Sequence, residues 1–188
     1  SLGGCGGDLG RGLPAPFVQW HPERLEIASP GGFPEGVTPA NILVHEPLPR
    51  NARLYEAAKR IGLVEQTGRG VDKVYLGQLR YGRPAPDYSR SDTTGVRLML
   101  RGGQESLQFA AFVFARERQR GPMTVEQMIV LNRLFHDRRV TTEQVVIEIQ
   151  RSQNEARAML ERLVEEGLVE ARGEKRGRVY HLAARFYN

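Results

Sequence analysis

The sequence contains one cysteine and no long apolar run. Cys5 cannot form an internal disulfide, and nothing beside it in the glycine-rich start would activate its thiol. Apolar runs such as residues 145–147 fall far short of the roughly 20 residues that cross a bilayer. The start also lacks a cationic segment leading into an apolar stretch, which disfavours a secretory signal. We therefore expect a cytoplasmic location and no membrane partner.

Histidines are few, and none is placed for metal binding. His21, His45, His136 and His181 are scattered singly, so no pair has the spacing of metal ligands, and we predict no metal site. The formal net charge of +5 permits a polyanionic partner. The excess is spread, however, because residues 1–115 carry 13 Lys and Arg against 11 Asp and Glu, and residues 122–188 carry 11 against 10. A nucleic-acid hypothesis must therefore depend on where individual cations lie.

The length of 188 residues, with 40% hydrophobic residues, leaves room for two small domains. Breaks at Gly-Gly and Gly-Pro pairs suggest the boundaries. We predict a glycine-rich N-terminal segment (1–16), a small layered α/β domain (17–103), a connecting helix and linker (104–121) and a helical domain ending in a hairpin (122–188). The predicted fold class is α+β.

In the first domain, alternating apolar residues predict two strands at 17–21 and 24–29, joined at Pro22, and a third strand at 95–100. Thr38 as an N-cap and Pro39 at the first helical position predict a short helix over 38–44. Further helices are predicted over 51–62 and 68–82, each ending at a glycine. In the connecting helix, residues 107, 110, 111 and 114 share one face.

The last 67 residues have the clearest pattern. Three helices are predicted to begin at capping residues: Thr124 with Gln127, Thr141 or Thr142, and Ser152 with Glu155. Two strands follow around the basic turn "RGEKRGR". Three helices followed by a strand, a basic turn and a strand is the order of a winged helix-turn-helix.

A helix fits the DNA major groove, and its N-terminus favours phosphate. We therefore expect helix 153–166 to enter the major groove and the wing, 172–178, to lie on the DNA backbone. Gln and Asn can pair with adenine and Arg with guanine, whereas the wing cations would meet phosphates. The candidate DNA contacts are Thr142, Arg151, Gln153, Asn154, Arg157, Arg172, Lys175, Arg176 and Arg178.

Structural explanations for the same residues stay open. The polar start of helix 153–166 is also typical of a solvated helix face, and a basic hairpin tip can protect a sheet edge. Glu161, Glu165 and Glu166 would repel phosphate along the second half of the helix. Winged helices also serve in protein–protein interaction, which is an alternative function.

The segments "RLEIASPGGFPEGVTPANIL" and "PRNARLYEAAKRIGLVEQTGRGVDKVY", followed by a winged helix, resemble the RecG-related transcriptional regulators of bacteria. The resemblance covers residues 18–100. It implies a fragment of a histidine-kinase-ATPase-like fold, a block named after the C-terminal domain of the ATP-dependent helicase RecG. Members of that family usually carry a Schlafen-like domain before this block, which residues 1–16 do not match. Either the chain is a fragment or its start comes from a different reading of the gene.

The resemblance also places two glycine turns, Gly31-Gly32 and Gly68 to Gly70, where such ATPases hold a nucleotide. Ser29 stands where an adenine-binding Asp is expected, and the magnesium-binding helix has no counterpart. We therefore predict no enzymatic activity and no cofactor, with an ATP-binding, helicase-related protein as the alternative. The leading hypothesis is a DNA-binding transcriptional regulator that binds double-stranded DNA as a homodimer, with helix 105–118 as the candidate dimer surface.

Overall fold

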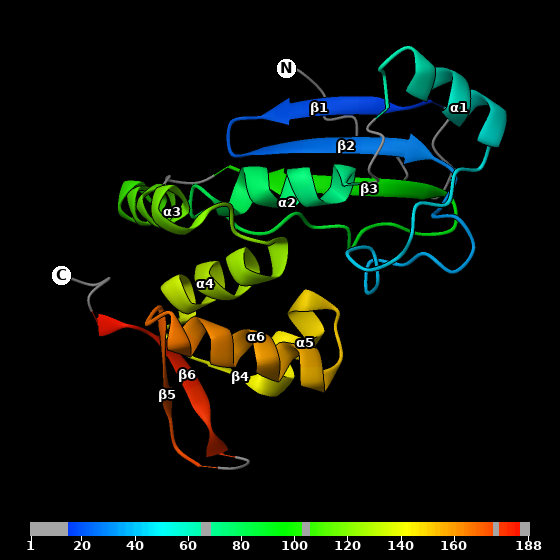
Figure 1. The fold of residues 1–188 in the computed structure, drawn as a ribbon. Helices are drawn as coiled ribbons and strands as arrows, with labels where there is room; N and C mark the ends of the chain where they lie inside the picture. The colour runs from blue at the N-terminus through cyan, green and yellow to red at the C-terminus, as the bar shows by residue number, and fades with distance from the viewer. Residues whose placement is uncertain (1–14, 65–68, 103–105, 175–176, 185–188) are drawn as a thin grey trace, which may run out of the picture.

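The computed structural model describes residues 15–64, 69–102, 106–174 and 177–184. Two three-stranded antiparallel sheets lie at opposite ends of a mixed α+β molecule, with helices between them (Figure 1). Among the described residues, no helix combines the length and apolar character needed to cross a membrane. The glycine-rich segment predicted over residues 1–16 falls almost entirely outside the described ranges.

The first sheet has the order β1-β2-β3. Its strands are Phe17–His21 (β1), Arg24–Pro30 (β2) and Gly95–Arg101 (β3). The hairpin and the third strand predicted from the sequence are therefore confirmed. Trp20 lies opposite Leu25, and Leu25 lies opposite Leu100, so these three side chains share one face of the sheet.

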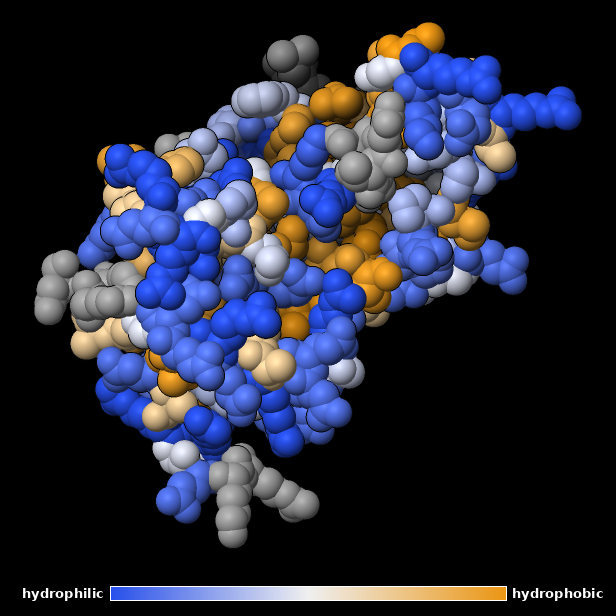
Figure 2. Space-filling model, in the orientation of Figure 1, coloured by the Kyte–Doolittle hydropathy of each residue, from blue (hydrophilic) through white to orange (hydrophobic). Residues whose placement is uncertain are grey.

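Helices Ala52–Arg60 (α1) and Gly70–Leu79 (α2) confirm two further predictions. Asn51 caps α1, because its side-chain oxygen accepts a hydrogen bond from the Leu54 backbone N–H at 2.9 Å. No residue of α1 is buried. In contrast, α2 buries Tyr75 and Leu79. Between α1, the start of α2 and the loop 33–48 lies a hollow of about 500 Å³, where Figure 2 shows hydrophobic side chains in orange.

The helix predicted over 38–44 is wrong, because this segment forms successive turns. In a helix the Leu43 N–H would donate to the Pro39 carbonyl oxygen. Instead, the Leu43 N–H donates to Oε1 of Gln150 at 2.9 Å, and Nε2 of Gln150 donates to the Pro39 oxygen at 2.8 Å. The side-chain amide of Gln150 thus bonds to the two backbone groups that would bond to each other in a helix. The sequence around residues 38–44 cannot reveal this, because Gln150 lies far away in the chain.

Gln150 stands in the left-handed conformation, with φ 57° and ψ 36°, between two helices of the C-terminal part. We expect Gln150→Ala to lower the free energy of unfolding by about 1–3 kcal/mol, because two backbone groups of the loop lose their partner. Gln150→Gly should be about 1 kcal/mol more stable than the alanine variant, because glycine adopts this conformation without strain. Urea unfolding measures both, and an alanine variant as stable as the wild type would contradict the role given to the amide.

The connecting helix, Leu107–Arg120 (α3), is confirmed as a helix, but its buried face differs from the apolar stripe seen in the sequence. The structure buries Phe109, Ala110, Val113 and Arg116. Leu107 and Phe114 are 76% and 43% exposed. Of the predicted stripe 107, 110, 111 and 114, only Ala110 is buried, because α3 packs on the rest of the protein through the neighbouring face.

The C-terminal part contains all three predicted helices and both predicted strands, with one further short strand. Its elements are Val125–Asp137 (α4), Val140–Thr141 (β4), Thr142–Ile149 (α5), Gln153–Glu165 (α6), Val169–Arg172 (β5) and Val179–Leu182 (β6). Complete capping boxes start α4, α5 and α6 at Thr124, Thr141 and Ser152. β4 was not predicted, because a strand of two residues has no readable alternation. It pairs with β6 and gives the sheet order β4-β6-β5.

One hydrophobic core connects the two parts. Tyr75, Leu79 and Phe109 belong to the same buried cluster as the inner faces of α4, α5 and α6. The side-chain amide of Asn132 on α4 donates to the carbonyl oxygens of Leu79 and Arg83, at 3.3 and 3.2 Å, where α2 ends. The chain breaks at Gly121-Pro122 as the sequence indicates, but the core continues across that point.

Candidate nucleic-acid interface

The start of α6 presents a polar face to solvent. The helix buries Ala156, Leu160 and Leu163 against the core, and this orientation leaves Gln153, Asn154 and Arg157 exposed on the other side. At the N-terminus of α6, Ser152 and Glu155 exchange the hydrogen bonds of a capping box. Three residues predicted to contact DNA therefore lie together on the accessible side of this helix.

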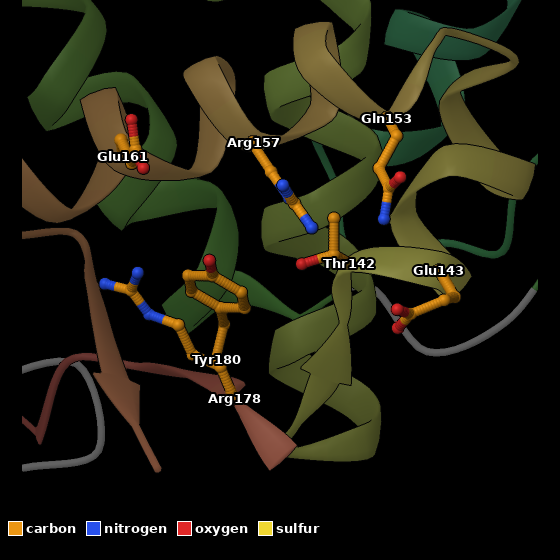
Figure 3. Close-up of a pocket in the computed structure, with 7 residues that line it drawn as sticks. All are labelled: Thr142, Glu143, Gln153, Arg157, Glu161, Arg178 and Tyr180. Atoms are coloured by element: carbon orange, nitrogen blue, oxygen red, sulfur yellow. The ribbon is translucent and has the colours of Figure 1, made fainter. Parts of the chain in front are cut away.

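Gln153 and Arg157, but not Asn154, line one wall of a concave surface of about 630 Å³, which we call the α6–β6 cleft (Figure 3). Gln153 and Arg157 point from α6 toward Thr142 at the start of α5 (Figure 3). The strand β6 supplies Tyr180, and Arg178 directly precedes that strand. The described residues that line the cleft are Thr142, Glu143, Gln153, Arg157, Glu161, Arg178 and Tyr180. The fold thus brings the start of α6 and the start of β6 to the same side of the protein.

The cleft carries both signs of charge. Arg157 and Arg178 face it together with Glu143 and Glu161. The pKa of Glu143 is lowered, first by the hydrogen bond from its own backbone N–H, then by the Thr141 side chain and the nearby charge of Arg157. Glu143 is therefore ionised at neutral pH. A carboxylate can accept a hydrogen bond from the exocyclic amine of cytosine, but it repels phosphate. The lining suits contact with base edges better than contact with a bare phosphate chain.

Most of the other candidate residues are paired with a neighbour or buried, although Thr142 and Arg178 line the cleft. Nη2 of Arg151 lies 2.9 Å from Oε1 of Glu126. Burial of the Glu126 carboxylate raises its pKa, but its hydrogen bonds and the charge of Arg151 outweigh this effect, so that the pKa is lowered overall. Thr142 lines the cleft but is only 8% exposed. Nη2 of Arg172 lies 3.3 Å from Oε2 of Glu170. The guanidinium of Arg178 lies 5.5 Å from the centre of the Tyr180 ring. Lys175 and Arg176, at the hairpin tip, lie outside the described residues.

Three residues of the cleft, Tyr180, Glu143 and Glu161, were not among the candidate DNA contacts, and Glu161 was expected only to repel phosphate. Tyr180 alternates with exposed neighbours in β6, which is the pattern of a buried strand residue, and it is 2% exposed. Glu143 follows the capping residue of α5, where acidic residues are common for helix stability alone. Neither signal distinguishes a residue that lines a cleft from a structural one.

The first glycine turn has its backbone donors engaged. The N–H groups of Gly31 and Gly32 donate to the carbonyl oxygens of Thr94 and Thr93 at 2.8 and 3.1 Å. The guanidinium of Arg50 donates to the Gly32 carbonyl oxygen. Gly31 has a φ of 76°, and glycine adopts this left-handed conformation without strain, so the conformation alone accounts for a glycine at this position. In the second turn Gly68 lies outside the described residues, and Gly70 is the first residue of α2.

The sheet of β1 to β3, with α1 and α2, is the part of the chain that comparison with known families recognises. Residues 15–100 match the family model described as "Putative ATP-dependent DNA helicase recG C-terminal". We call this range the RecG C-terminal-like block. The match bears out the resemblance read from the sequence for this block, and it ends before α3 begins.

A solved structure extends the comparison. The DIP2311 protein from Corynebacterium diphtheriae is 27% identical to this chain, with a TM-score of 0.70. The similarity covers 87% of this chain, so it continues beyond the RecG C-terminal-like block into the helices that follow. This chain spans only about a third of that protein, since 34% of it is covered. A search of curated proteins found no match.

Proposed function

We propose that the protein is a DNA-binding transcriptional regulator whose residues 122–188 form a winged helix-turn-helix domain. The observation that supports this most strongly is the α6–β6 cleft, in which Gln153 and Arg157 from α6 share one concave surface with Arg178, the residue before β6. A winged helix needs that arrangement, because the recognition helix and the wing must reach the same DNA at once. Opposite orientations would have excluded it.

In this proposal α6 enters the major groove with its N-terminal turn first. Gln153, Asn154 and Arg157 then contact base edges, and Arg178 contacts the backbone beside the groove. Glu161 lies one turn further along α6 than Arg157, so its charge favours shallow insertion of the second half of the helix. The hairpin of β5 and β6 acts as the wing. Residues 17–103 act as the scaffold or sensor and 104–121 as the connector.

We further propose that the regulator acts as a homodimer, because a single winged helix contacts only a short DNA site. The outward stripe of α3, with Leu107 76% and Phe114 43% exposed, is the surface that we assign to pairing. Two-fold pairing would place two α6 helices on half-sites one helical turn apart.

The test is a salt titration of duplex binding. We expect Arg178→Ala to reduce the slope of log affinity against log salt by about 0.9, the value for one lost phosphate contact on duplex DNA. Arg157→Ala should instead cost about 1–3 kcal/mol on a selected site and less on random duplex. Arg53→Ala, which removes an exposed cation of the RecG C-terminal-like block, is the charge-matched control and should change neither quantity.

Two results would contradict the proposal. An unchanged slope in Arg178→Ala would remove the wing from the interface. Absence of duplex binding at low salt would favour a protein-interaction module. Calorimetry with ATP and magnesium tests the nucleotide-binding alternative separately, and micromolar binding would support it.

A further inference from the structure

Trp20 is the only tryptophan of the sequence, and it lies on the surface. Its side chain is 82% exposed on the edge strand β1 of the RecG C-terminal-like block. A ring of this size normally buries most of its area, and Trp is enriched where proteins bind partners. Val18, which lies on the same face of β1, is 68% exposed. The fold of the described residues leaves this ring without a structural role.

The indole forms one wall of a groove between the first sheet and α2. This groove, which we call the Trp20 groove, has a volume of about 590 Å³, within the range of ligand-binding sites. Leu25, Leu100 and Val74 contribute apolar lining. Gly77 of α2 lies in the lining, and a Cβ added there would meet no atom within 4 Å, so the helix approaches the groove without filling it.

Cations surround the groove. Arg24, Lys73, Arg83 and Arg101 all line it, and no Asp or Glu is among the described residues that do so. The guanidinium of Arg83 lies 5.7 Å from the centre of the Tyr81 ring. Two of the cations have carboxylate partners: Nε of Arg24 lies 2.5 Å from Oε1 of Glu26, and Nη2 of Arg101 lies 3.7 Å from Oδ2 of Asp87. Exposed ion pairs of this kind contribute only about 0–1 kcal/mol each, so a phosphate can replace either carboxylate. The side chains of Arg24 and Arg101 are 42% and 57% exposed.

An exposed aromatic ring beside a row of cations is the arrangement that binds single-stranded nucleic acid. Unpaired bases stack on the ring, and the cations follow the phosphates. A duplex cannot use the ring in this way, because its bases are already stacked. An acidic peptide would use the cations, but it covers the indole with a ring only where it contains an aromatic residue, whereas every base of a single strand has a flat face. Charge complementarity and the indole together favour the nucleic acid.

We propose that the Trp20 groove binds a short segment of single-stranded DNA or RNA, with a base stacked on Trp20 and phosphates held by Arg24, Lys73, Arg83 and Arg101. This site is separate from the α6–β6 cleft, because no residue lines both. The groove is lined by residues at the turn from β1 to β2, and Figure 1 shows that this turn and the terminal hairpin lie at opposite ends of the molecule.

Since Trp20 is the only tryptophan, its fluorescence reports on this groove alone. Titration of the full chain with oligo(dT) at low salt should quench the emission, because thymine stacks on the indole. The affinity for labelled oligo(dT), measured by anisotropy, should fall about tenfold in Trp20→Ala, and Trp20→Phe should restore part of it. Arg101→Ala should reduce the salt slope by about 0.7, the value for one phosphate contact on a single strand.

Variants elsewhere separate this site from the proposed duplex interface. Arg53→Ala, Arg157→Ala and Arg178→Ala should leave the quenching by oligo(dT) unchanged. If the wild-type protein binds no duplex DNA at low salt while oligo(dT) still quenches Trp20, the proposed function is overturned and this inference stands. Binding of oligo(dT) without quenching would place the single strand elsewhere and overturn the inference, as would no binding at low salt. Quenching by poly-glutamate as strong as that by oligo(dT) would assign the groove to an acidic peptide.

Discussion

Replacement of Phe109 by Ala is expected to lower the free energy of unfolding by about 3–5 kcal/mol, the usual cost of removing a large aromatic ring from a core. Phe109 is 1% exposed and lies in α3, between the RecG C-terminal-like block and the C-terminal helices. Its ring centre is 5.0 Å from that of Phe135 on α4. The variant would therefore open a cavity in the core that both parts share.

This variant also tests whether the two parts unfold together. Amide hydrogen exchange of β1, β2 and β3, followed against urea, reports on the first sheet, and far-UV circular dichroism reports mainly on the helices. Because Tyr75 and Leu79 share one buried cluster with Leu131 and Leu160, we expect the two urea transitions to coincide in the wild type and to shift together in Phe109→Ala. Separate transitions would show two independent units and contradict the shared core.

Phe114→Ala is the matched control, because it removes the same side chain from the same helix at a 43% exposed position. At a concentration at which the protein is monomeric, it should change stability by about 0.5 kcal/mol or less. A loss as large as that of Phe109→Ala would mean that the outward face of α3 packs against the core after all.

Features encoded by neighbouring residues were predictable from the sequence. The three capping boxes at Thr124, Thr141 and Ser152 each need only a side chain and a backbone group three residues apart. The β1–β2 hairpin likewise follows from alternation on either side of Pro22. Such signals determine where an element begins and ends, and these boundaries agree closely with the structure.

Features that depend on distant partners were not predictable. The segment 38–44 has a good helix start, yet Gln150, more than 100 residues away, takes its hydrogen-bonding groups. In α3 two apolar faces compete, and only the position of α4 decides that Phe109 rather than Leu107 is buried. For the candidate site, the sequence predicted that Arg157 lies on a helix and Arg178 in a hairpin. Only the folded structure shows that the two side chains line the same cleft.

The second large effect is expected when the carboxylate of Glu166 is removed. Arg116 on α3 is buried, with its side chain 9% exposed, and its Nη2 lies 2.8 Å from Oε2 of Glu166 at the end of α6. Its Nη1 donates to the carbonyl oxygen of Gly121 at 2.7 Å, and its Nε is buried with no partner among the described residues. Glu166→Ala leaves this charge without its counter-ion. We expect a loss of about 3–5 kcal/mol in the free energy of unfolding.

The position of this pair explains why it matters for the proposed function. Glu166 was expected from the sequence to repel phosphate, but its side chain is 15% exposed and binds Arg116 instead. The pair fixes the C-terminal end of α6 to α3, whereas Gln153 and Arg157 lie near the other end. An attachment at one end of a rigid helix sets the direction in which the opposite end points. Loss of the ion pair should therefore weaken sequence discrimination as well as stability.

A double-mutant cycle separates the ion pair from ordinary packing. Arg116→Met together with Glu166→Leu replaces two buried charges by apolar side chains of similar size, and it should recover most of the stability lost in Glu166→Ala. Asp137→Ala, which breaks the exposed pair with Arg133, is the control and should cost about 1 kcal/mol or less. If Glu166→Ala costs no more than Asp137→Ala, solvent reaches Arg116 and the ion pair does not fix α6. If the apolar double variant is as unstable as Glu166→Ala, the loss comes from packing rather than from an unpaired charge.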